Sequence, residues 1–315
     1  MPLLKKRVSA FSVVVFLAMG AIWISTCTNV MAQMPQPLVS EETLTKVSEH
    51  VFVLAGYPNI GIVVGARATL VIDTGLGERN GATVVRVAQK LAKSPTLYLT
   101  TTHYHSEHTS GEQAFPANTI IIRPAAQQEE MNKLVAAHID LFRSRSEQNK
   151  ELLKDVRYRV PDILFDREVK LDLGGVTARL FWLGAAHTKG DELIFVEEDS
   201  VLLPGDIVQK NFFPIMPDEN SNVKGWLAIL DQLESLNPRL IVPDHAAPVV
   251  DASQIGKERA YLLDLQARAS ELKHQNVSVD EAGKIVTTEF HAKYPDWPNT
   301  GNIAGEVMRV YNQTQ

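Results

Sequence analysis

Cysteine is almost absent from this sequence of 315 residues, since its single copy is Cys27 near the N-terminus. We interpret that region below as a cleaved signal, so the mature chain can form no disulfide and has no thiolate to act as nucleophile or metal ligand. Basic residues are also fewer than acidic ones. Residues 1–32 hold three of the 31 Lys and Arg and none of the 37 Asp and Glu, which leaves 28 basic against 37 acidic residues, a formal net charge of −9. We see no basic stripe and expect no nucleic-acid partner.

Long apolar runs are also missing, except for Val8 to Ile24, which follows Lys5-Lys6-Arg7 and precedes Val30-Met31-Ala32. This order of basic, apolar and small residues is typical of a secretory signal. We therefore predict a signal peptide over residues 1–32 and an exported protein, periplasmic or secreted, with no membrane association after cleavage. A single-pass anchor is the alternative, although 17 residues are short for a span of about 20. A lipoprotein attached through Cys27 is a third possibility.

The rest of the chain has the composition of a globular protein, with 45% hydrophobic residues over the whole sequence. We predict a leader over residues 33–50, a main domain over 51–252, and C-terminal helices over 253–315 that pack on the same domain. Short β-branched runs followed by amphipathic helices occur twice in the main domain. Two such halves indicate two sheets packed face to face with helices outside, an α+β architecture.

These patterns predict individual elements. Runs between Gly, Pro and Asn indicate an antiparallel meander in the first three strands, and apolar positions at helical spacing indicate the helices. The expected strands are 51–54, 61–65, 68–72, 119–122, 169–173, 176–182, 192–196, 201–203 and 240–242, and the expected helices include 84–91, 125–156, 226–233 and 253–273.

Three histidines and one carboxylate lie within six residues, at His103, His105, Glu107 and His108, shortly after the apolar run Leu97 to Leu99. At the end of a strand, His103 and His105 project from the same side. His108 rejoins that side if the chain turns there into a helix. Imidazole is the commonest zinc ligand and a carboxylate is a regular companion, so this stretch predicts a metal site.

The same stretch resembles the His-x-His-x-Asp-His signature of the metallo-β-lactamase superfamily, with Glu107 where the family usually has Asp. The resemblance extends over about Val51 to Asp251 and implies a four-layer αββα sandwich. The further matches, in the order of the family, are Val71-Ile72-Asp73-Thr74-Gly75, Gly184-Ala185-Ala186-His187-Thr188, Leu203-Pro204-Gly205-Asp206 and Val242-Pro243-Asp244-His245.

The resemblance implies two zinc ions and a ligand set. His103, His105 and His187 would hold one zinc, Glu107, His108 and His245 the second, and Asp206 would bridge the two. Zinc lowers the pKa of a bound water to roughly 7, which gives a hydroxide nucleophile near neutral pH. The predicted activity is hydrolysis of an ester, thioester, lactone or amide bond in a small molecule, with Glu107 and Asp206 as catalytic residues.

Other residues are candidates for supporting roles. Asp73 ends a buried apolar strand, and we expect it to brace the metal loop without touching metal. Tyr57 and Asn59 lie in a loop that overhangs the metal site in relatives, so both are candidate substrate contacts. Lys210 is the nearest candidate for a lysine that grips a substrate. We leave His138 out of the site, because a lone histidine on an apolar helical face is more often a packed core residue.

Two alternative functions remain open. The first is a true β-lactamase that hydrolyses β-lactam antibiotics. The second is a zinc-binding protein with impaired catalysis, because the extra methylene of Glu107 moves its carboxylate about 1.5 Å further out than that of Asp.

Overall fold

The computed structural model describes residues 38–217 and 219–313. The predicted signal peptide, 1–32, and the first part of the predicted leader lie outside the described residues. Among the helices of the described ranges, none combines the length and the apolar character that crossing a membrane requires.

The first sheet consists of seven strands arranged in chain order. Strands β1 to β4 pair antiparallel, which confirms the predicted meander, whereas β4 to β7 pair parallel. Parallel neighbours need crossover connections, and helices supply them. The strands are β1 (Leu44–Lys46), β2 (Val51–Leu54), β3 (Ile60–Val64), β4 (Thr69–Ile72), β5 (Leu97–Thr100), β6 (Ile120–Pro124) and β7 (Ile163–Phe165), and the crossover helices are α1 (Gly77–Leu91), α2 (Ser106–Thr109), α3 (Ala125–Arg145) and α4 (Glu147–Leu152).

The second sheet has six strands in the order β13-β12-β11-β10-β9-β8, and all neighbours are antiparallel except β11 and β12. Helix α5 (Val223–Leu236) connects that parallel pair. The strands are β8 (Glu168–Asp172), β9 (Thr177–Trp182), β10 (Glu192–Val196), β11 (Val201–Leu203), β12 (Leu240–Ile241) and β13 (Val250–Asp251).

The two sheets share one hydrophobic core. Leu70 and Ile122 of the first sheet belong to the same buried cluster as Leu180 and Ile194 of the second. On the other face of the first sheet, α1 buries apolar side chains such as Val84 against the strands. Two sheets flanked by helices confirm the fold predicted from the sequence.

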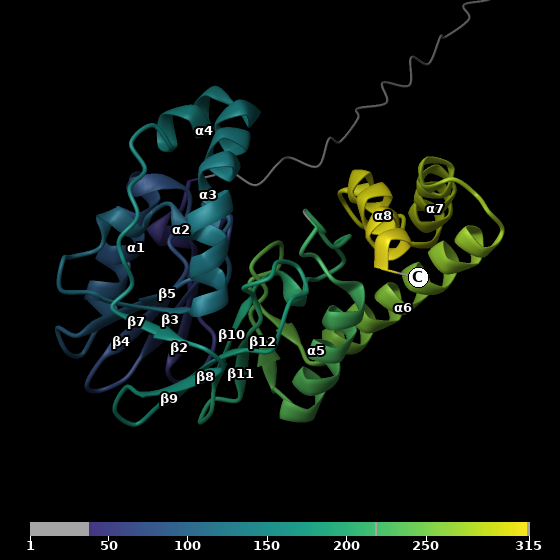
Figure 1. The fold of residues 1–315 in the computed structure, drawn as a ribbon. Coiled ribbons are helices and arrows are strands. Elements are labelled where there is room, and N and C mark those ends of the chain that lie inside the picture. Colours follow the sequence, from purple (N-terminus) through teal and green to yellow (C-terminus); the bar gives the residue numbers. More distant parts are fainter. Residues whose placement is uncertain (1–37, 218, 314–315) are drawn as a thin grey trace, which may run out of the picture. The chain divides into compact units, whose positions relative to one another are not determined.

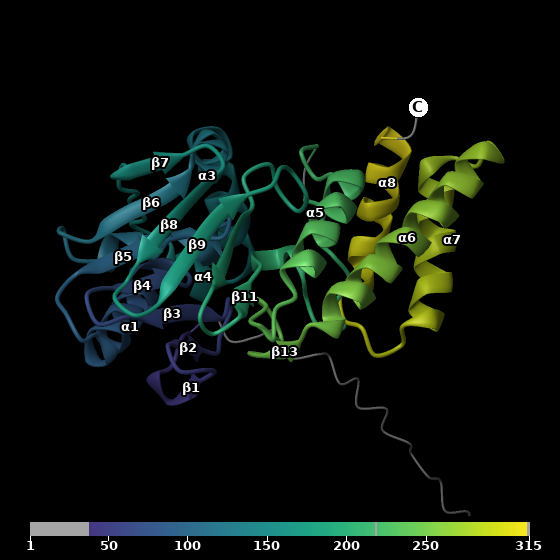
Figure 2. The same ribbon diagram turned by 90° about the horizontal axis from the view of Figure 1, so that it is seen from below.

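Three helices complete the chain, namely α6 (Ser253–His274), α7 (Val279–Lys293) and α8 (Ile303–Gln313). In both views α6 lies beside α5, and α7 and α8 pack against α6 and against each other (Figure 1 and Figure 2). Their apolar side chains, including Leu262, Val286 and Val307, share a cluster with Phe195 of the second sheet. The C-terminal helices therefore extend the core of this sheet.

Three details differ from the sequence-based expectation. The described part of the predicted leader, residues 38–50, is part of the fold, because Val39 is buried, its N–H donates to Asn80, and β1 pairs with β2. The helix predicted over 125–156 is broken at Ser146, whose side chain accepts from Asn149 N–H and caps a separate helix α4. Strand β7 was not predicted, because two of its three residues are exposed and no periodicity marks it.

Candidate metal centre

The histidine-rich stretch leaves the end of β5 and turns into the short helix α2. His103 and His105 lie in the loop, His105 is the residue before the first turn of α2, and Glu107 and His108 are on that turn. All four side chains are buried. The turn into a helix after His105 brings His108 back toward His103, with ring centroids 4.0 Å apart.

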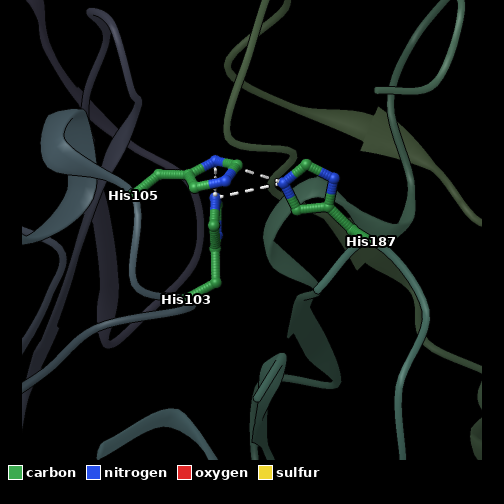
Figure 3. A group of neighbouring side chains, drawn as sticks. All are labelled: His103, His105 and His187. Atoms are coloured by element: carbon green, nitrogen blue, oxygen red, sulfur yellow. Dashed lines mark hydrogen bonds between the residues drawn. The ribbon is translucent and has the colours of Figure 1, made fainter. Parts of the chain in front are cut away.

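Three imidazole nitrogens converge on one point. Nε2 of His103 is 3.0 Å from Nδ1 of His105, and Nε2 of His187 lies 3.3 Å and 3.4 Å from these two atoms. Figure 3 shows the three rings turned toward one another, His187 coming from the second sheet's side of the site. Nitrogens bound to zinc at 2.0–2.1 Å with tetrahedral angles are separated by about 3.3 Å, so this spacing suits a shared cation.

Asp206 lies between this group and a second one. Its Oδ2 is 3.4 Å from Nε2 of His187, while its Oδ1 is 3.2 Å from Nε2 of His245. His245 in turn forms a group with Glu107 and His108, whose ligand atoms lie within 4.8 Å of one another. The structure thus brings all seven predicted ligands together, and the two oxygens of Asp206 face different histidines.

The side-chain atoms at the centre are better suited to bind a cation than to hydrogen-bond to one another. Oε2 of Glu107 and Nε2 of His108 are buried, and neither has a hydrogen-bond partner among the described residues. Leaving such groups unpaired is costly. Burial, together with the neighbouring imidazoles, holds the pKa of His103 and His105 well below the usual range, so their lone pairs are free. Burial opposes ionisation of Asp206, but His245 and His187 outweigh it and lower its pKa.

Protein oxygens set the orientation of two rings. Nδ1 of His187 donates to the carbonyl oxygen of Ile215 at 2.7 Å, and Nδ1 of His108 donates to Oδ2 of Asp73 at 2.9 Å. In both rings Nε2 is then the atom that faces the centre. Asp73 follows β4 in a left-handed conformation, with φ 69°, and its Oδ1 also accepts from Thr102 N–H.

A second carboxylate near His108 was not identified in the sequence. Oδ2 of Asp244 accepts from the Thr102 hydroxyl at 2.9 Å and lies 3.4 Å from Nδ1 of His108. Burial, and next the charge of Asp73, raises the pKa of Asp244 well above its usual range. Asp244 stands directly before the ligand candidate His245 at the end of an apolar strand, and this position in the sequence could have identified it.

His138 was left out of the predicted site, but the structure places it against a ligand candidate. Its ring stacks on His105, with centroids 4.1 Å apart and planes 4° from parallel. Its Nδ1 accepts from Ser106 N–H at 3.1 Å, and burial lowers its pKa to about 3, so the ring is neutral. His138 thus packs like a core residue and at the same time fixes the plane of His105.

A pocket of about 260 Å³ opens beside these side chains, and His105 and Glu107 are among the residues that line it. Of the three predicted substrate contacts, Tyr57 lines this pocket and its ring lies 4.6 Å from that of His245. Asn59 is buried elsewhere, where its amide donates to the carbonyl oxygens of Pro243 and Ala247 and joins two loops. Lys210 is exposed, and neither it nor Asn59 is among the described lining residues.

The fold and this centre define a class: αββα proteins that carry two adjoining groups of histidine and carboxylate ligands at the edge of the sandwich. The sequence profile of the metallo-beta-lactamase superfamily matches residues 53–245. The chain therefore belongs to the metallo-beta-lactamase superfamily. No curated protein matches it.

Solved structures share the fold at low sequence identity. A metallo-beta-lactamase from Pontibacter korlensis is 17% identical with a TM-score of 0.54, and the match covers 70% of this chain and 98% of that chain. The stereoselective inverting sec-alkylsulfatase Pisa1 from Pseudomonas sp. is 15% identical with a TM-score of 0.64, over 86% of this chain and 50% of that chain. The metallo-beta-lactamase DIM-1 is 15% identical with a TM-score of 0.53, over 72% and 98%.

Proposed function

We propose that the protein is an exported, zinc-dependent hydrolase that cleaves an ester, thioester, lactone or amide bond in a small molecule. The observation that carries this proposal is the position of Asp206, whose two oxygens face two different groups of ligands beside a pocket. A carboxylate between two cation sites and next to a substrate-sized space is the arrangement that metal-assisted hydrolysis needs.

The residues of the chain have separate tasks in this proposal. His103, His105 and His187 would hold one zinc, Glu107, His108 and His245 the other, and Asp206 would contact both. When bound, zinc supplies Lewis acidity and lowers the pKa of a coordinated water to about 7. Asp73 and the Ile215 carbonyl keep two of the rings in the orientation that presents Nε2. Glu107 and Asp206 remain the proposed catalytic carboxylates.

The walls of the pocket restrict the substrate. Tyr57 covers His245 on one side, and apolar side chains such as Leu134 and Phe142 line the other. Such walls exclude water from a bound acyl group and strengthen electrostatic interactions at the reacting bond. A β-lactam is one compound with an amide bond that this space would accept, so the β-lactamase alternative belongs in the test.

Sulfate esters are a second candidate class of substrate. The sec-alkylsulfatase matches 86% of this chain, a larger share than the 70% matched by the metallo-beta-lactamase from Pontibacter korlensis. Hydrolysis of an alkyl sulfate would also place a hydrocarbon group against apolar pocket walls.

The test combines metal analysis with a substrate panel. The full chain is purified without chelators, its zinc content is measured, and turnover of a chromogenic cephalosporin, a thioester, a lactone, a nitrophenyl ester and a secondary alkyl sulfate is followed. About two zinc ions per chain with turnover of one acyl substrate is the expected result. Turnover of the alkyl sulfate alone would replace the acyl proposal, and bound zinc without turnover of any compound would favour a zinc-binding protein.

Export is tested separately. After expression in a bacterium with a periplasm, the mature protein is expected in the periplasm or the medium and is expected to begin at Gln33. Recovery of an intact N-terminus in the membrane fraction would instead indicate an anchor.

A further inference from the structure

One face of α3 forms a wall of the pocket beside the metal centre. Leu134, His138, Leu141 and Arg145 recur at intervals of four, three and four residues, which places them on one side of the helix. All four line the pocket together with His105 and Glu107. The sequence of α3 thus presents two leucines, one neutral histidine and, at its last residue, one guanidinium to the same space.

The apolar part of this wall is only partly covered. Leu141 lines the pocket and is 51% exposed, so its side chain lies at the border between the pocket and solvent. Exposed apolar surface at the mouth of a pocket is where the hydrocarbon part of a ligand gains most from leaving water.

Arg145 is the only lysine or arginine among the described residues that line the pocket. Its guanidinium carbon lies 3.7 Å from the centre of the Phe142 ring. Arg145 is exposed, and its guanidinium hydrogen-bonds to the side chain of Tyr57, which lines the same pocket, so the positive charge lies at the rim of the pocket.

Arg145 has no acidic partner within the described ranges, in contrast to its neighbour on α3. Arg143 donates to Oδ1 of Asp140 and to the carbonyl oxygen of Leu153, so its guanidinium is held by the protein. Beyond its bond to Tyr57, a guanidinium that stacks on an aromatic ring keeps its other N–H groups available in a plane, which suits two-point binding of a carboxylate or a similar anion.

We propose that Arg145 binds an anionic group of the substrate and that Leu134 and Leu141 hold the adjoining hydrocarbon. This inference rests on the proposed hydrolase function and narrows its substrate class to acyl compounds with an apolar chain that ends in a carboxylate or another anion. Arg145 is then the residue that determines specificity, a role for which the sequence had suggested Lys210.

A pair of esters with the same leaving group tests this inference. Mono(4-nitrophenyl) glutarate carries a carboxylate at the end of its acyl chain, and 4-nitrophenyl pentanoate has the same chain length without it. For Arg145→Met in the full, zinc-loaded chain, we expect the KM for the glutarate ester to rise about 10- to 100-fold, because a hydrogen bond between charged groups is lost. The KM for the pentanoate ester should change less than about 2-fold, and Arg145→Lys should restore part of the binding.

Lys150→Met is the matched control, because Lys150 is an exposed cation on α4 that pairs with Glu147 and lies outside the lining residues. It removes the same charge and should leave both KM values unchanged. Equal changes for the two esters in Arg145→Met, or no change for either, would overturn the assignment of Arg145.

A binding measurement separates this inference from the proposed function. Calorimetric titration with hexanoate and with 1-hexanol needs no turnover. Arg145→Met is expected to weaken hexanoate binding about 10-fold or more and to leave 1-hexanol unaffected. If the unmodified protein hydrolyses neither ester but this binding difference is found, the hydrolase proposal fails and the anion site stands. If hexanoate binds equally to both variants, the anion site is refuted whatever the turnover.

Discussion

The carboxylate of Asp73 lies 2.9 Å from Nδ1 of His108, and both side chains are inaccessible to solvent. The same carboxylate accepts from Thr102 N–H, one residue before His103. Asp73 therefore connects β4 with the loop after β5 and fixes His108 with Nε2 directed at the centre.

Replacing Asp73 by Asn removes the negative charge and keeps the size of the side chain. We expect Asp73→Asn to weaken zinc binding about 10- to 100-fold, because a carboxylate behind a histidine ligand fixes the ring and increases its basicity. Competition with a fluorescent chelator measures this affinity. Asp172→Asn, in an exposed ion pair with Arg67, is the control and should bind zinc like the unmodified protein. Equal affinities for all three proteins would show that Asp73 has no influence on the metal.

Glu107 is expected to be a ligand despite its extra methylene. Its carboxylate belongs to the group with His108 and His245, and one oxygen has no hydrogen-bond partner among the described residues. Glu107→Ala should lower the zinc content from about two ions to about one per chain and reduce turnover. Glu129→Ala, at an exposed ion pair with Lys189, should change neither quantity. Full metal content and a normal rate in Glu107→Ala would exclude Glu107 as a ligand.

The variant Glu107→Asp tests whether the backbone of α2 can move to compensate for a shorter ligand side chain. Both Thr74 N–H and the Thr74 hydroxyl donate to the carbonyl oxygen of His108, so the backbone of α2 is held in place. A shorter carboxylate would then stop about 1.5 Å short of its position. We expect zinc affinity of the second site between those of Glu107→Ala and the unmodified protein, measured by the same chelator competition.

The sequence predicts much of the sheet framework because local patterns determine it. Strands β2, β10 and β11 have the predicted bounds, since each is a short apolar or β-branched run that is largely buried. Strands β1 and β7 were not predicted, because each has three residues and neither is fully buried. Their pairing depends on neighbouring strands and not on their own sequence.

The site shows the same division between local and tertiary information. His103, His105 and His108 are close in sequence, so their spacing alone indicated a common centre. His138 and Arg145 reach the pocket because α3 packs across α2. The spacing of residues in the sequence does not indicate this contact. Asn59 was expected to contact the substrate, but its amide donates hydrogen bonds to two backbone carbonyl oxygens of another loop instead.

The close packing of α1 on the segment that follows α2 leads to a prediction about Gly81. A Cβ at Gly81 would lie 2.1 Å from the carbonyl oxygen of Gly111, so Gly81→Ala must push α1 away from the segment after α2. We expect a loss of about 1–3 kcal/mol in the free energy of unfolding and weaker zinc binding. Gly256→Ala on α6 is the control, because nothing lies within 4 Å of its Cβ, and alanine there should stabilise the helix by roughly 0.5–1 kcal/mol. Equal stability of the two variants would contradict the packing argument.

Glu306 gives the C-terminal helices a pH-dependent contribution to stability. It is fully buried on α8, where the Tyr261 hydroxyl donates to it and Glu258 is a second buried carboxyl nearby. Burial raises the pKa of Glu306 from 4.5 to about 8. Between these values the folded state keeps a proton that the unfolded state has released, so stability falls as the pH rises, by up to about 1.4 kcal/mol per pH unit.

Glu306→Gln keeps the shape of the side chain and cannot ionise. Its free energy of unfolding relative to the unmodified protein should therefore increase steadily from pH 5 to about pH 8 and then level off. Urea denaturation of both proteins over this range, at saturating zinc, measures the difference. Glu258 titrates in both proteins and largely cancels in the comparison. A constant difference across the range would mean that Glu306 ionises in the folded state near its usual pKa.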